Sequence, residues 1–343
     1  MASLSGSATG ILARAIGHRL EAYKVRHMEI TAVVATAYGG PEVLSIIESS
    51  VGEPEPGQVL VDVRAAGTNP VDYKLYSGTY GDDPSKLPLR LGLEAAGVVR
   101  SVGGDAEGPS GPIRPGDEVI VFHASGAYAS AILASAKEVL AKPSALTFEE
   151  ASGLMLTGTT AVHALRATGV SAGATVVVHG AAGGVGLMAV QLAVADGARV
   201  IATAASAQHD LLRSFGAEPV LYGEGLLERI RALAPDGVDA AIDLIGTDEA
   251  SDVSVALVAD RRRVVTIVAF GRAAQLGIQA IGGGPGADPG TEIRAAARLE
   301  LVRRAEAGAL RVIVAATFPL AEAAEAHREL ARGHTHGKIV LVP

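Results

Sequence analysis

The sequence has no cysteine and no tryptophan, and only 3% of its 343 residues are aromatic. The lack of cysteine excludes disulfides, thiolate zinc sites and a redox mechanism through a thiol. A chain without disulfides fits a reducing compartment, and we expect a cytoplasmic protein. No apolar run reaches the length of about 18 residues that a membrane span needs, so no membrane association is expected.

The sequence also lacks a strong excess of one charge sign. Its 29 basic and 37 acidic residues are interspersed and leave a formal net charge of −8. This balance argues against nucleic acids and anionic membranes as partners. The chain is 49% hydrophobic and contains 42 glycines without low-complexity repeats. The chain is longer than one that ordinarily folds around a single hydrophobic core, so two domains are expected. We expect a protein of the α/β class.

Residues 1–27 differ from the rest, with four Lys or Arg residues against the single acid Glu21. The segment resembles a weak organelle presequence. An added leader, or a start codon placed upstream of a natural beginning at Met28, explains it equally simply. We therefore treat residues 1–27 as a leader or disordered extension.

The most informative stretch is residues 180–186, which read Gly-Ala-Ala-Gly-Gly-Val-Gly directly after an apolar run. A buried strand followed by such a turn and a helix is how many proteins hold a dinucleotide pyrophosphate. Gly180 allows a tight bend, Gly183 lets the backbone approach the phosphates, and Gly186 lets the helix pack on the strand. The alternative is an ordinary strand–turn–helix corner.

The residues beyond this turn alternate between apolar strands and helical patterns as far as residue 268. This alternation predicts a doubly wound parallel sheet. By contrast, residues 28–150 read as short strands divided by glycine and proline, which is typical of a compact β-barrel. Thr147 and Glu150 form a capping-box pattern at the start of a helix. We expect domains at 28–150 and 151–309, with 310–343 returning to the first.

Several motifs together resemble the medium-chain dehydrogenase/reductases, in particular their zinc-independent quinone oxidoreductase branch, which includes zeta-crystallin. Residues 92–99 (Gly-Leu-Glu-Ala-Ala-Gly-Val-Val) resemble the barrel signature of that superfamily, and 69–72 (Asn-Pro-Val-Asp) a segment of the branch. Residues 116–119, 181–186 and 337–341 also agree. The resemblance spans residues 28–343 and implies an α/β protein: a GroES-like β-barrel catalytic domain plus a doubly wound Rossmann nucleotide-binding domain.

Zinc alcohol dehydrogenases of this superfamily bind catalytic zinc through cysteine and histidine. Here Leu93 stands where their signature has histidine, and residues 66–69 contain no first ligand. The histidines elsewhere form no convincing metal set. We therefore expect no metal, which makes oxidation of an alcohol unfavourable because nothing polarises the alkoxide.

The expected cofactor is NADPH, because NAD sites usually place an acid after the second strand and residues 201–208 contain none. Ser206 and Tyr222 can hydrogen-bond a 2′-phosphate, and His209 stands where similar enzymes often carry lysine. Ordinary helix surface is the alternative for each. By pattern and resemblance together, the candidate cofactor residues are Thr157, Gly180, Ala182, Gly183, Gly184, Val185, Gly186, Ser206, His209, Tyr222 and Lys338.

The resemblance places Asn69, Asp72 and Tyr80 in the acceptor pocket as catalytic candidates. Asn69 offers an amide donor to a developing negative charge, and Tyr73, Tyr76 or Tyr80 offers a phenol. The alternatives remain open: Asn69 ends a strand, Asp72 caps a helix, and Tyr80 lies on the surface. Similarly, the alternative for Thr157 is a hydrogen bond from its hydroxyl to the local helix backbone, as is common for mid-helix threonines. The alternative for Lys338 is a solvated lysine at a strand end.

The expected reaction is hydride transfer from NADPH to a small hydrophobic quinone or α,β-unsaturated carbonyl. The alternatives are an enoyl-thioester reductase and a non-catalytic NADPH-binding protein that acts as a sensor or as a crystallin-like component. An edge strand near residues 275–281 would extend the sheet across a two-fold axis, so a homodimer is expected.

Overall fold

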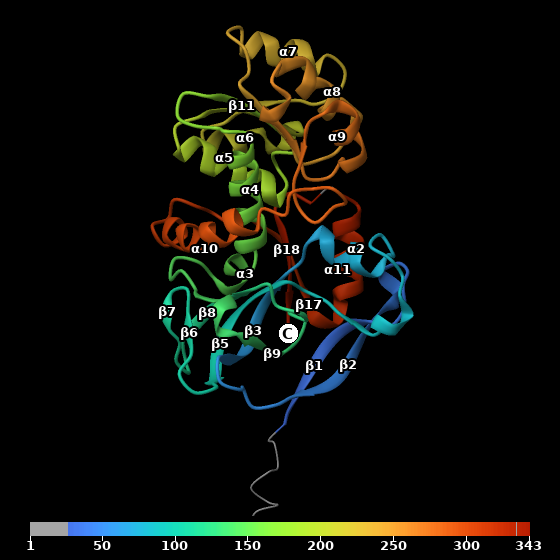
Figure 1. Cartoon of the computed structure of the whole chain (residues 1–343), viewed down its shortest axis with the longest axis vertical. Helices are drawn as coiled ribbons and strands as arrows, with labels where there is room; N and C mark the ends of the chain where they lie inside the picture. The colour runs from blue at the N-terminus through green and yellow to red at the C-terminus, as the bar shows by residue number, and fades with distance from the viewer. Residues whose placement is uncertain (1–26, 334) are drawn as a thin grey trace, which may run out of the picture.

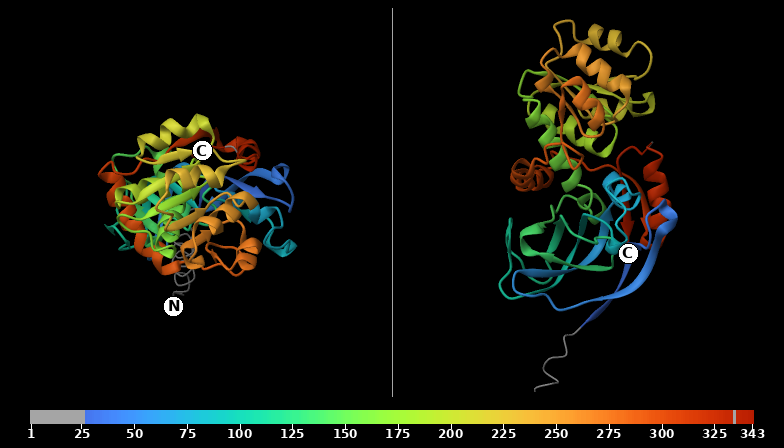
Figure 2. Two further views of the ribbon diagram at one scale, coloured as in Figure 1. Left: turned by 90° about the horizontal axis from the view of Figure 1, so that it is seen from above. Right: turned by 45° about the vertical axis from the view of Figure 1, so that its right-hand side comes forward.

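The computed structural model describes residues 27–333 and 335–343. The leader or extension expected at the N-terminus therefore lies, apart from His27, outside the described residues. The chain forms two bodies, a barrel and a parallel sheet, stacked along the long axis of the molecule (Figure 1). The right-hand view in Figure 2 shows α4 (Met155–Ala167) and α10 (Thr291–Glu306) at the waist between them.

The barrel is built from short strands of the N-terminal half and two strands from the C-terminus. In chain order its strands are β1 (Met28–Ala35), β2 (Leu44–Val51), β3 (Gln58–Gly67), β4 (Leu89–Arg90), β5 (Glu94–Val102), β6 (Glu107–Gly108), β7 (Gly111–Pro112), β8 (Glu118–Phe122), β9 (Ala131–Ser135), β10 (Val139–Ala141), β17 (Val314–Pro319) and β18 (Lys338–Val342). The helices α2 (Pro70–Tyr76), α3 (Phe148–Ala151) and α11 (Ala323–Ala331) accompany them.

The C-terminal strands complete the barrel rather than extending the other sheet. The main barrel sheet runs β10-β8-β5-β3-β18-β17, with β9 also paired to β3. Strand β18 is antiparallel to β3, with Val340 opposite Gly67, and parallel to β17. This pairing places Lys338, at the start of β18, beside the residues that follow β3.

The second body is a six-stranded, wholly parallel sheet. Its strands are β11 (Thr175–His179), β12 (Arg199–Thr203), β13 (Glu218–Val220), β14 (Ala240–Asp243), β15 (Val264–Thr266) and β16 (Gln279–Ala280). They are ordered β13-β12-β11-β14-β15-β16, so the chain order reverses at β11. This is the Rossmann arrangement, in which ligands bind at the carboxyl ends of the strands near the reversal. The predicted fold class is therefore confirmed.

Helices cover both faces of the parallel sheet. They are α4, α5 (Gly184–Ala195), α6 (His209–Ser214), α7 (Leu226–Leu233), α8 (Asp248–Leu257) and α9 (Phe270–Leu276). One continuous apolar core joins Ile120 and Phe122 of the barrel, through Met155 of α4, to Val176 and Val178 of the sheet. Because the two bodies share this core, packing fixes the geometry of the site between them.

The predicted capping box is confirmed at the start of α3. The Thr147 hydroxyl accepts from the Glu150 amide at 3.2 Å, and the Glu150 carboxylate accepts from the Thr147 amide at 2.9 Å. Strand β16 lies at the edge of its sheet, as expected. Among the described residues, no helix combines the length and apolar character needed to cross a bilayer.

Candidate cofactor and catalytic site

The glycine-rich turn after β11 is a tight bend that packs the strand closely against α5. Gly180 has φ of +74°, a left-handed conformation that favours glycine. A Cβ at Gly186 would lie 2.4 Å from the Gly180 carbonyl oxygen, so only glycine fits there. A Cβ at Gly183, however, would meet only that same oxygen, at 3.5 Å. The face of the turn at Gly183 is therefore open.

The open face coincides with the N-terminus of α5. Gly183 is the N-cap residue, and no side chain caps the helix. The first amides of a helix have no intrahelical partner and carry a partial positive charge. An anion such as a pyrophosphate fits this position, because it can accept from these amides without meeting a side chain of the turn.

Apolar side chains are exposed where the strands of the parallel sheet end. Of seven large hydrophobic side chains exposed among the described residues, four lie within two residues of the ends of β13, β14 and β15. These four are Leu221, Tyr222, Ile245 and Val268, with exposed fractions of 47%, 54%, 48% and 36%. Exposed apolar side chains along the carboxyl edge of such a sheet are typical of a ligand-binding surface.

The segment after β12 begins beside the glycine-rich turn. The side chain of Thr203, at the end of β12, accepts from the Gly180 amide at 3.3 Å. Ser206 is exposed, and His209 is held by a hydrogen bond of 3.2 Å between its Nε2 and the Ala204 carbonyl. No carboxylate stands in residues 201–208. The segment can therefore accept a ligand with a further phosphate.

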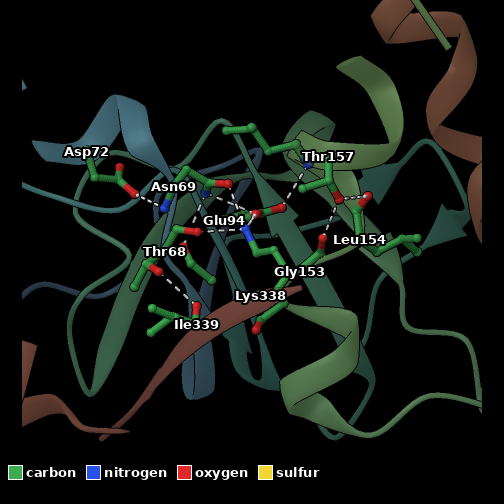
Figure 3. Close-up of polar contacts among 12 residues, drawn as sticks. Thr68, Asn69, Asp72, Glu94, Gly153, Leu154, Thr157, Lys338 and Ile339 are labelled. Atoms are coloured by element: carbon green, nitrogen blue, oxygen red, sulfur yellow. Dashed lines mark hydrogen bonds and ion pairs between the residues drawn. The ribbon is translucent and has the colours of Figure 1, made fainter. Parts of the chain in front are cut away.

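Below the turn, a buried ion pair joins the barrel to α4 (Figure 3). The Lys338 ammonium lies 3.0 Å from Glu94 Oε1, and both residues are at most 4% exposed. Glu94 Oε2 accepts from the Leu156 amide at 2.9 Å. The Lys338 stem also runs under the turn, because its Cδ lies 3.4 Å from the Cβ position of Gly184. Lys338 is thus not solvated. Its aliphatic stem lies beside the turn, whereas its ammonium points to Glu94 and Asn69.

Asn69 is held in one orientation by this ion pair. Its Oδ1 accepts from the Lys338 ammonium at 2.6 Å, and its Nδ2 donates to Glu94 Oε1 at 3.1 Å. The Lys338 ammonium also donates to the Thr68 carbonyl at 2.7 Å, so its three protons are all engaged. Asn69 and Lys338 therefore form a rigid, charge-balanced platform.

Asp72 caps the helix that Asn69 begins, and it is fully buried. Its Oδ2 accepts from the Asn69 amide at 2.8 Å and from the Tyr128 hydroxyl at 2.9 Å. Its Oδ1 has no hydrogen-bond partner among the described residues. Burial raises the pKa of Asp72 to about 7, although the Tyr128 hydrogen bond opposes the rise. Asp72 is thus a cap, as the alternative interpretation held, and also a titratable group beside the platform.

Thr157 and Tyr80 occupy different positions from these buried groups. The Thr157 hydroxyl donates to the Gly153 carbonyl at 2.7 Å, as expected of a mid-helix threonine. Its methyl group lies 3.1 Å from the Cβ position of Gly184 and so touches the turn. Tyr80 is 41% exposed and stands in the loop after α2. The structure thus brings Asn69, Asp72 and Lys338 together and leaves Tyr80 outside that cluster.

Sequence reasoning missed Glu94, Tyr128 and His327. Glu94 is the single acid in the otherwise apolar segment 92–99, and a lone charge at a strand position was the available signal. No local pattern singles out Tyr128 or His327. No group of three or more His, Cys, Asp or Glu residues that could hold a metal occurs among the described residues.

Two family descriptions match the chain. An alcohol dehydrogenase GroES-like domain matches residues 55–187, and a zinc-binding dehydrogenase domain matches residues 215–341. The second description names zinc, whereas the chain has leucine at position 93 and no cysteine. The matched pair defines the medium-chain dehydrogenase/reductase class.

Similar proteins and solved structures place the chain more narrowly within the medium-chain dehydrogenase/reductase class. The chain is 36% identical to a quinone oxidoreductase of Pseudomonas aeruginosa over 90% of its length and 98% of the relative's. A quinone oxidoreductase of Escherichia coli crystallised with NADPH superposes with a TM-score of 0.77 at 31% identity, covering 91% and 100% of the two chains. An NAD-dependent alcohol dehydrogenase superposes with a TM-score of 0.79 at 30% identity, covering 91% and 99%. The chain belongs to the quinone oxidoreductase family.

Proposed function

We propose that this protein is an NADPH-dependent oxidoreductase that reduces a quinone or an α,β-unsaturated carbonyl. The observation that carries the proposal is the open N-terminus of α5, set between an acid-free segment and the Lys338–Asn69 platform. Gly183 leaves room for a pyrophosphate, and Ser206 and Tyr222 are exposed where a 2′-phosphate would be bound. The bound NADPH supplies a hydride, which passes to the acceptor with its electron pair.

The residues of the platform orient the reactants rather than form covalent bonds. Thr157 and Gly184 are in contact where α4 meets the turn, and Lys338 fixes the distance between this contact and Asn69. A platform whose polar groups are already paired loses little energy to reorganisation when negative charge develops on the acceptor oxygen. A proton from solvent then neutralises that oxyanion.

Asp72 acts on this step through its charge. An ionised carboxylate beside Asn69 repels the negative charge that hydride transfer creates on the acceptor, whereas the neutral acid does not. Because burial raises the pKa of Asp72 to about 7, we expect turnover to fall as the pH rises above neutrality. Turnover falls rather than rises with pH because the protonated form of Asp72 is the one that favours hydride transfer.

The proposed reaction needs no metal of the protein. The test is NADPH oxidation, followed by absorbance, with a panel of quinones, alkenals, enones and enoyl thioesters, each with and without chelator. We expect NADPH oxidation with quinones or enones at a rate that chelator leaves unchanged. Turnover that chelator abolishes and zinc restores would refute it, and activity on thioesters alone would favour an enoyl-thioester reductase.

We also propose a homodimer formed at the β16 edge of the parallel sheet, the position from which a second copy of the sheet could continue it. Asp288 already pairs with the Ala280 carbonyl and the Gly282 amide at this edge, so the contact would have to displace it or form beside it. Sedimentation tests this proposal. A single species of 34.7 kDa, the mass of one chain, would reject it.

A further inference from the structure

Behind the platform, four buried side chains form a continuous hydrogen-bonded chain. The Tyr128 hydroxyl, which donates to Asp72, lies 3.1 Å from Nε2 of His327. The other ring nitrogen of His327 lies 2.8 Å from the Tyr76 hydroxyl. Asp72 and Tyr76 come from α2, Tyr128 from the segment before β9, and His327 from α11, which lies beside α2 in Figure 1. None of the four is more than 1% exposed.

The two phenol rings also fix the imidazole in place. The rings of Tyr76 and His327 are stacked with centroids 5.6 Å apart, and Tyr128 meets His327 edge-on at the same distance. Contacts of this kind restrict a side chain to one rotamer. His327 is therefore held where both of its nitrogens face a hydroxyl.

The hydrogen bonds can all point toward Asp72. An ionised carboxylate only accepts, so Tyr128 must donate to it. The Tyr128 oxygen is then free to accept from His327 Nε2, and His327 Nδ1 accepts from Tyr76. This arrangement needs the neutral imidazole, and burial lowers the pKa of His327 to about 4. The chain thus stabilises the charged form of Asp72 against the cost of its burial.

Within this cluster, Asp72 is the group that titrates near neutral pH. Burial and the charge of Glu94 raise its pKa, whereas the Tyr128 hydroxyl, the Asn69 amide and the Lys338 ammonium lower it. Burial raises the pKa of both Tyr76 and Tyr128, so neither phenol ionises in this range. The charged or titratable groups near Asp72 on the surrounding elements are Tyr76 (α2), Glu94 (β5), Tyr128 (before β9) and Lys338 (β18), and His327 (α11) reaches Asp72 only through Tyr128.

We propose that Tyr128 and His327 are positioning residues that act through Asp72 and set the upper pH limit of turnover. Tyr128 donates directly to the carboxylate, and His327 holds the Tyr128 hydroxyl in the donating direction. This inference rests on the proposed function for its effect on turnover. Its effect on Asp72 itself can be measured without any acceptor.

The experiment compares Tyr128→Phe, His327→Leu and His327→Gln with the wild type. The first readout is the titration midpoint of Asp72, taken from the protonated-carboxyl band in infrared difference spectra with Asp72→Asn as the blank. Loss of the Tyr128 donor should raise the midpoint by about one pH unit. His327→Leu should raise it by less, and His327→Gln, which keeps a donor, should restore it. Tyr38→Phe is the control, since its hydroxyl bonds only the Asp83 carbonyl in an exposed loop.

The second readout is the pH profile of kcat, in which the alkaline fall should move to higher pH in the same order. A residue that only packs would lower stability and leave both midpoints in place, and this result would overturn the inference. A shifted Asp72 midpoint with an unshifted kcat profile would also overturn it. If the wild type reduces no acceptor, the proposed function fails, and the infrared midpoints still decide whether Tyr128 and His327 control Asp72. If Tyr128→Phe does not fold, the His327→Leu and His327→Gln pair decides.

Discussion

Replacing Gly183 by serine should separate cofactor binding from stability. Gly183 has φ −75° and ψ 169°, the extended conformation in which serine caps a helix. Its Cβ would have an ordinary contact of 3.5 Å with the Gly180 oxygen, so serine fits without strain. The new hydroxyl would accept from the first amides of α5, which are the donors that the account assigns to the pyrophosphate.

The two effects of Gly183→Ser have opposite signs. A serine cap and a less flexible unfolded chain together should raise the free energy of unfolding by about 0.5–1 kcal/mol. Occupation of the anion site should weaken NADPH binding at least about tenfold, which corresponds to about 1.4 kcal/mol. NADPH fluorescence gives the Kd and urea unfolding gives the stability. The chain has no tryptophan, so the background fluorescence is low.

The matched control is Gly186→Ala, at a position that faces the strand instead of the cofactor. Its Cβ would lie 2.4 Å from the Gly180 oxygen, so we expect a loss of about 1–3 kcal/mol of stability from overpacking. A Gly183→Ser variant that binds NADPH with the Kd of the wild type would refute the assignment of the pyrophosphate to this turn. A loss of stability in Gly183→Ser equal to that of Gly186→Ala would also refute the assignment, since the face of the turn at Gly183 would then not be open.

Three further predictions concern the ribose segment and the buried charges. Ser206→Asp should raise the Kd for NADPH at least about tenfold and leave that for NADH little changed, because a carboxylate repels the 2′-phosphate; equal losses for both cofactors would contradict it. Glu94→Gln should lower the free energy of unfolding by about 3–5 kcal/mol, because it leaves the buried Lys338 ammonium without the carboxylate with which it pairs directly. The double variant Glu94→Leu/Lys338→Met should recover most of that loss in urea unfolding, and no recovery would argue against the ion pair. The raised pKa of Asp72 favours the folded state below about pH 4, and this advantage is lost as the pH rises to about 7. Relative to Asp72→Asn, the wild type should therefore lose up to about 4 kcal/mol in its free energy of unfolding over that range. Curves of stability against pH that run parallel for the two proteins would contradict the assignment.

The sequence predicted well what depends on neighbours along the chain. The turn at residues 180–186 and the capping box of Thr147 and Glu150 are local patterns, and both have their expected geometry. The alternation of strands and helices predicted the parallel sheet, because each strand–helix unit buries its own apolar face. The short strands divided by glycine and proline predicted the barrel, to which residues 310–343 were expected to return, and the family resemblance identified that barrel as GroES-like.

What the sequence did not predict depends on residues far apart in the chain. Lys338 and Glu94 are 244 positions apart, and only the pairing of β18 and β5 with β3 brings their charges together. His327 and Tyr128 are separated by 199 positions. Asp72 was correctly considered as a cap, but its raised pKa follows from burial, which the segment 69–72 does not reveal. Long-range packing thus decides the electrostatics of the site.

The central claim is that the open N-terminus of α5 binds the pyrophosphate of NADPH. A fluorescence titration of the folded wild-type protein with NADPH, repeated with Gly183→Ser, tests it most directly. We expect saturable binding of one NADPH per chain and a Kd at least about tenfold higher in the variant. If the folded wild-type protein binds neither NADPH nor NADH, the claim is contradicted.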